Sequence, residues 1–108
     1  MVEIRQYADR PGSYPFERWL LNQNDAARAR ITIALAKLEN GNFSAVKGSG
    51  ASVYELRLDF GPGYRVYFGK DGETIVILLG GGIKKRQQTD IETARARWQQ
   101  YKRGKQEE

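Results

Sequence analysis

The stretch VYELRLDFGPGYRVYF, residues 53–68, decides the architecture of this chain. Apolar and polar residues alternate over 53–58 and again over 64–68, which is the period of β-strands with one buried face. Between them lies GPG, residues 61–63, which favours a tight turn because glycine accepts positive φ and proline fixes its own. We predict an antiparallel hairpin with two chemically different faces.

One face of this hairpin is apolar and the other is charged. The apolar face comprises Tyr54, Leu56, Leu58, Val66 and Phe68. The opposite face comprises Glu55, Arg57, Asp59, Arg65 and Tyr67. This charged row is either an ordinary solvated sheet face, with the arginines as cross-strand partners of the acids, or the floor of a functional site.

Further strands are predicted on both sides of the hairpin. Downstream, KDGE (residues 70–73) contains the Asp-Gly turn signal, and TIVILL (74–79) is apolar on both faces, as a central strand should be. Upstream, VEIRQY (2–7) alternates and predicts a first strand. The glycine- and serine-rich segment GNFSAVKGSGAS (41–52) is predicted to be a loop.

Two short-linked helices are predicted between the first strand and this loop. Ser13 is placed to cap a short helix that has Pro15 in its first turn. Asn24 or Asp25 is expected to cap a second helix, which Gly41 ends. The link between them is so short that the helices should form an antiparallel hairpin, covering the apolar sheet face.

A last helix is predicted after GGGIKKRQQ, residues 80–88, which should leave the sheet. Thr89 and Glu92 have the spacing of a capping box that would open this helix. The triple glycine matches neither a phosphate-binding loop nor a dinucleotide fingerprint, and it suggests a tight bend or a close approach to another chain. One apolar row is expected to pack on the body of the protein: Ile91, Ala94, Trp98 and Tyr101.

The order of these elements predicts an α+β fold. It consists of a strand, a helical hairpin, a three-stranded antiparallel meander and a C-terminal helix, in a single domain over residues 1–108. The apolar runs are shorter than the roughly 18 residues of a membrane span. We therefore expect a soluble, cytoplasmic protein.

Composition limits the chemistry and indicates a polyanionic partner. Histidine and cysteine are absent, which excludes imidazole and thiolate catalysis and the usual zinc sites, and no cofactor is expected. The chain has 18 Lys and Arg against 13 Asp and Glu, a net charge of +5. Such an excess favours association with nucleic acid, although a solvated helix face would account for much of it.

Several cationic segments converge on the charged face of the hairpin. Arg57 and Arg65 should be neighbours there, because adjacent strands carry them to the same side. Guanidinium groups suit phosphate, since they donate two parallel hydrogen bonds. Tyr67 is a candidate for stacking on an unpaired base. The other candidate RNA-binding residues are Lys47, Lys85 and Arg86, with Lys84 beside them.

The chain resembles type II toxins of the RelE/ParE superfamily, in particular the small HigB-like addiction module killer proteins related to phage-derived proteins. Beyond residues 53–68, the resemblance is carried by FERWLLNQNDAARARI (16–31), LENGNFSAVK (38–47) and ILLGGGIKKRQQTDIETARARW (77–98). It implies a growth-inhibiting toxin that cuts mRNA on the ribosome without a metal. It also implies a cognate antitoxin of the helix-turn-helix, HigA-like kind, through which alone the toxin would reach operator DNA.

The resemblance also implies roles for individual residues. Arg65 matches the arginine that stabilises the transition state, and Arg57 and Glu55 fall where RelE-like toxins place lysines. Lys84 matches the basic residue after the last strand, and Asp90 falls near the position of a C-terminal tyrosine. An arginine is a poor general base. The base is therefore Glu55 or Asp90, unless cleavage relies mainly on positioning.

Two other functions remain compatible with the sequence. A ParE-like protein would inhibit DNA gyrase by binding it, without catalysis, and its cations should be dispersed rather than gathered. A non-toxic nucleic-acid-binding module would use the same basic surface.

Overall fold

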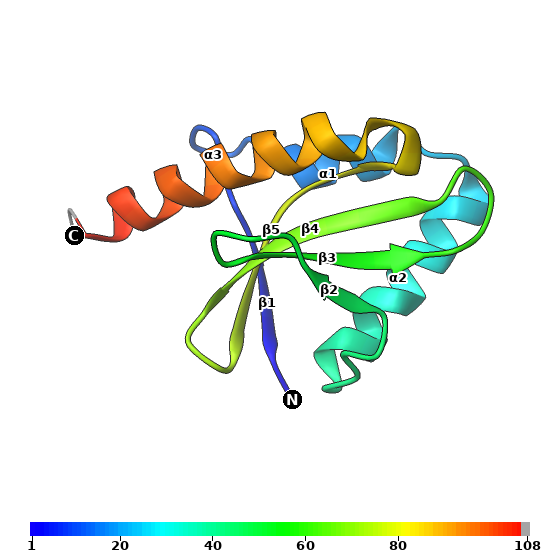
Figure 1. The fold of residues 1–108 in the computed structure, drawn as a ribbon, viewed down its shortest axis with the longest axis horizontal. Helices are drawn as coiled ribbons and strands as arrows, with labels where there is room; N and C mark the ends of the chain where they lie inside the picture. Colours follow the sequence, from blue (N-terminus) through cyan, green and yellow to red (C-terminus); the bar gives the residue numbers. More distant parts are fainter. Residues whose placement is uncertain (107–108) are drawn as a thin grey trace.

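The computed structural model describes residues 1–106 (Figure 1). The strands are β1 (Glu3–Gln6), β2 (Val46–Gly48), β3 (Val53–Leu58), β4 (Tyr64–Asp71) and β5 (Ile75–Ile83). The helices are α1 (Pro15–Leu21), α2 (Asp25–Glu39), the short 3-10 helix η1 (Lys84–Arg86) and α3 (Gln87–Gln106). Over residues 1–106, no helix is both long enough and apolar enough to cross a membrane.

The strands of the described chain form one mixed sheet in the order β1-β5-β4-β3-β2. β1 pairs with β5 in parallel, and the other neighbours are antiparallel. The predicted α+β class, with its strand, helical hairpin, antiparallel strands and C-terminal helix, is confirmed. The predicted central position of the strand after KDGE is confirmed too, since β5 lies between β1 and β4.

The sheet has one strand more than the prediction, which consisted of a first strand and a three-stranded meander. Residues 46–48, assigned to a loop from their glycine-rich surroundings, form β2 and pair with β3 from Val46↔Leu56 to Gly48↔Tyr54. The prediction of a loop was wrong there because so short an edge strand takes its conformation from its neighbour's backbone hydrogen bonds. Such pairing leaves almost no periodic signal in the sequence.

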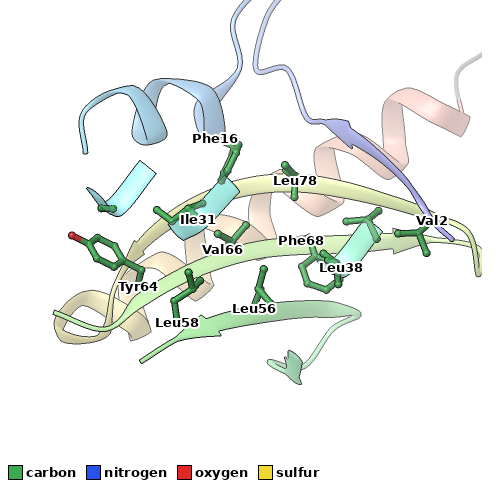
Figure 2. Packing of buried hydrophobic residues seen from close by; sticks show 12 residues of the cluster. Val2, Phe16, Ile31, Leu38, Leu56, Leu58, Tyr64, Val66, Phe68 and Leu78 are labelled. Atoms are coloured by element: carbon green, nitrogen blue, oxygen red, sulfur yellow. The ribbon is translucent and has the colours of Figure 1, made fainter. Parts of the chain in front are cut away.

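The helical hairpin covers the apolar face of β3 and β4, as predicted (Figure 2). Phe16 of α1 and Ile31 and Leu38 of α2 are buried against this face. Asn24 caps α2 by accepting a hydrogen bond from the Ala27 N–H at 2.9 Å. The predicted Ser13 cap is wrong: α1 begins after Tyr14, and the Ser13 hydroxyl accepts a hydrogen bond from Arg18 instead.

The opposite sheet face is not an open, solvated surface, because α3 lies over much of it. A second hydrophobic cluster lies between this face and α3. It comprises Val53, Tyr67, Ile77, Leu79, Ala94 and Trp98, with Ile91 and Tyr101 packed against it. The indole of Trp98 occupies the space above Gly69, where any side chain would collide with the ring. The expected docking of the last helix on the protein's own body is therefore confirmed.

The start of α3 and the end of β5 differ from the prediction. β5 continues through the triple glycine to Ile83 rather than leaving the sheet at residue 80. Side chains at Gly81 and Gly82 would collide with Trp19 of α1 and with Asp90 of α3, respectively. α3 begins at Gln87, so Thr89 lies inside the helix and is not its cap. The glycines thus admit side chains from both flanking helices.

Candidate functional site: a cationic cluster beside α3

Strand register brings the two hairpin arginines together. Arg57 on β3 is the direct partner of Arg65 on β4, and Arg65 is in turn the partner of Gly82 on β5. Directly paired residues share a sheet face, so these positions form one row across the sheet. Asp90 of α3 lies over the glycine end of this row, in the space that a side chain at residue 82 would fill.

A second row runs parallel to the first, two residues along each strand. It pairs Lys47 on β2 with Glu55 on β3, Glu55 with Tyr67 on β4, and Tyr67 with Gly80 on β5. The guanidinium of Arg97, from α3, occupies the space over Gly80. The two rows together gather the predicted site residues of β2, β3 and β4 on the face that α3 partly covers.

Glu55 is fixed in place by two neighbours. It is 1 % exposed, and Arg57 donates to its Oε1 at 2.6 Å. The side-chain amide of Gln87, the first residue of α3, donates to Oε1 at 3.0 Å and to Oε2 at 3.1 Å. Since both carboxylate oxygens already accept hydrogen bonds, Glu55 acts here as the anchor of Arg57.

Arg65 has a different environment. It is 4 % exposed, and its Nη1 donates to its neighbour's backbone carbonyl, Tyr64 O, at 3.1 Å. Among residues 1–106, its Nε has no hydrogen-bond partner and no carboxylate lies within ion-pair distance of its guanidinium. A buried cation with unsatisfied donors is costly, and a bound anion would remove that cost.

Lys84 lies beside this unpaired guanidinium. Its backbone N–H donates to the Gly63 carbonyl at 2.7 Å, which ties the start of η1 to the turn between β3 and β4. A Cβ on Gly63 would lie 3.2 Å from the Lys84 Cβ and 3.6 Å from the Arg65 Nη1. The small glycine thus leaves room for the Lys84 and Arg65 side chains beside this turn.

Tyr67 contributes a hydroxyl rather than a ring face. The residue is 1 % exposed and belongs to the hydrophobic cluster under α3, so the predicted stacking of its ring on a base is wrong in this structure. Its hydroxyl is buried without a hydrogen-bond partner among the described residues. Burial raises the pKa of this hydroxyl well above its usual range, and the nearby charges of Glu55 and Asp90 add to the shift. It therefore remains a protonated donor.

Asp90 is the carboxylate of the cluster that is least engaged. No hydrogen bond or ion pair holds it within the described chain, and it is only partly buried. Burial raises its pKa, an effect that the charges of Arg86 and Arg97 oppose. A carboxylate whose pKa is raised is a stronger base than that of an ordinary aspartate, which suits a residue that accepts a proton.

The remaining predicted residues lie at the margin of the cluster. Lys47, Lys85 and Arg86 are exposed, the first on the edge strand and the other two in η1. Asp59 lies just beyond the end of β3, is exposed, and forms no ion pair within the described chain. The proposed pairing of this acid with the strand arginines was therefore wrong.

Three residues of α3 that the sequence did not single out contribute to the site. Gln87 holds Glu55, and Arg97 Nη1 donates to the Leu79 carbonyl at 2.8 Å. Arg95 donates to the Ser49 carbonyl and so fixes the β2–β3 turn. The triple glycine signalled a close approach to β5, but periodicity alone could not say which helix face would make it.

Fold and site together define an α+β protein with a cationic cluster between a mixed sheet and its last helix. The chain belongs to the phage-derived protein Gp49-like family (DUF891), whose model matches residues 18–99. It is also 41 % identical over 81 residues to a protein of Haemophilus influenzae described as an uncharacterized protein. That match covers 74 % of this chain and 82 % of the relative.

Proposed function

We propose that this protein is the toxin of a type II toxin–antitoxin system, of the RelE and HigB kind, and that it cleaves mRNA on the ribosome. The observation that carries the proposal is the buried guanidinium of Arg65, which has no carboxylate partner in the described chain. An RNA phosphate would satisfy its free donors, and the Lys84 side chain, which starts next to Arg65, would reach the same phosphate. Such an activity belongs to the cytoplasm, where the ribosomes are.

The reaction that fits these groups is attack of a ribose 2′-oxygen on the adjacent phosphorus, with loss of the 5′-oxygen. Negative charge grows on the phosphate oxygens in the transition state, where fixed cations act most strongly. Arg65 and Lys84 supply that charge, and the protonated Tyr67 hydroxyl is an additional donor in the same cluster. Arg57, whose charge Glu55 partly balances, is a secondary phosphate contact.

Proton transfer in this scheme falls to Asp90 and Lys84. Asp90 accepts the proton of the 2′-hydroxyl as the new phosphorus–oxygen bond forms, because its carboxylate is unengaged and its pKa is raised. The Lys84 ammonium gives a proton to the 5′-oxygen as the old bond breaks. Glu55 is a positioning residue, since Arg57 and Gln87 occupy both its oxygens.

The cations of the site lie close together, which supports RNA cleavage over gyrase inhibition. Dispersed cations would be expected of a ParE-like poison, whereas Arg57 and Arg65 are direct strand partners and Lys84 adjoins Arg65. The basic surface also suits the cognate antitoxin that the proposal requires, a helix-turn-helix protein of the HigA kind, because complementary charge speeds association.

The test compares purified variants on ribosomes that carry a defined mRNA. Arg65→Ala should reduce cleavage about 100-fold or more, as expected for removal of one donor to a developing oxyanion. The matched control is Arg103→Ala, which removes an exposed arginine near the end of α3. Full cleavage by Arg65→Ala, with the same thermal stability as the wild type, would refute the proposal.

A further inference from the structure

A groove of about 340 Å³ lies between α2 and β3, on the sheet face away from α3. Its apolar floor is made by Leu56 and Leu58 of β3 and Ala34 of α2. β2 pairs with β3 as far as Leu56, and one further backbone hydrogen bond joins the Arg57 N–H to the Ala45 carbonyl, so that only the last residue of β3, Leu58, lies beyond this pairing. Ile33 borders the groove and is 56 % exposed, unusually open for a large aliphatic side chain on a packed helix.

Cations surround this apolar floor. Arg30 and Lys37 lie on the same face of α2 as Ile33, at helical spacings of three and four residues, and both line the groove. No acidic residue is among those that line it within the described chain. The groove therefore has an aliphatic centre and a positively charged rim.

We propose that this groove binds an acidic, amphipathic segment of a protein partner, which on the function proposed above is the antitoxin. Apolar side chains of that segment would cover Ile33 and the floor, and its carboxylates would pair with Arg30 and Lys37. RNA fits this surface less well. Its bases need an open aromatic face or guanidinium plane, and the Arg30 guanidinium already lies 4.5 Å above the Phe60 ring.

The test selects peptides from a random display library on the immobilised protein and measures their affinity by fluorescence anisotropy. Enriched peptides should carry acidic residues together with apolar residues at helical spacing. Ile33→Glu and Arg30→Glu should each weaken binding about tenfold or more. Thr32→Glu is the matched control, because Thr32 is exposed on the same helix and does not line the groove.

Other results would overturn the inference. Enrichment of basic peptides, or equal binding of the selected peptides to the wild type and the groove variants, would contradict the proposal that this groove binds an acidic partner. A fall in oligoribonucleotide affinity on Ile33→Glu would make the groove an RNA site instead. Peptide binding does not depend on cleavage, so a protein that binds these peptides but cuts no mRNA would refute only the proposed function.

Discussion

Arg57 and Arg65 are direct partners across β3 and β4, yet within the described chain only Arg57 has a carboxylate to pair with. Glu55 lies two residues before Arg57 on the same strand face and holds it at 2.6 Å. Arg65 donates to the backbone carbonyl of Tyr64 and keeps a buried, unsatisfied Nε. Two chemically identical side chains in one row therefore have different environments, and the following variants test whether their roles differ as well.

Lysine substitutions should affect the two arginines unequally. Arg57→Lys keeps a cation that can still pair with Glu55, so we expect cleavage to fall only severalfold. Arg65→Lys replaces a planar fork with a point charge and should cost tenfold or more, about 1.4 kcal/mol of transition-state stabilisation. Single-turnover cleavage on programmed ribosomes measures both rates, and equal losses would contradict the assignment of roles.

The two carboxylates should also respond differently to neutral isosteres. Asp90→Asn removes the proposed base and should lower the rate by about 100-fold or more. Glu55→Gln should have a smaller effect on the rate, mainly through a loosened Arg57, because its oxygens are already engaged. The opposite order of effects in the same cleavage assay would transfer the role of base to Glu55.

Asp90 should make stability depend on pH. Its pKa is raised in the folded state from an ordinary value of 3.8, chiefly by burial, so the folded protein favours the protonated carboxyl. That contribution to stability is present below pH 3.8 and is lost as pH rises through the folded-state pKa. The free energy of unfolding of Asp90→Asn, measured in urea, should therefore rise relative to that of the wild type as pH rises through this window. A constant difference across pH would contradict the raised pKa.

The packing of α3 should be visible in thermal stability. Trp98 is 3 % exposed and fills the space above Gly69, so Trp98→Ala should lower the free energy of unfolding by about 3–5 kcal/mol. Gln99→Ala, at an exposed position of the same helix, serves as the control. An unchanged Tm for Trp98→Ala would mean that the helix is held mainly by a partner rather than by the sheet.

The parts of the fold that sequence predicted well are those fixed by local periodicity. Alternation in residues 53–68 determined the hairpin and carried Arg57 and Arg65 to one face. Side-chain chemistry predicted the Asn24 cap. The edge strand β2 escaped prediction because it is only three residues long and depends on pairing with β3.

The site was harder to predict because tertiary packing decides it. Tyr67 belongs to an alternating strand pattern whose charged members suggested solvent, but α3 buries its ring. The placement of α3 depends on Gly69 and on the triple glycine, whose missing side chains make room for Trp98 and Asp90. Periodicity records which residues share a face, and it does not record what covers that face.

The most direct test of the central claim is a map of mRNA ends after induced expression of the protein. We predict new 5′ ends within the coding region of a translated reporter transcript, and none in a matched transcript whose start codon has been removed. Arg65→Ala, expressed at an equal soluble level, should produce no new ends. Growth inhibition with intact translated transcripts, or equal growth inhibition by Arg65→Ala, would contradict the account.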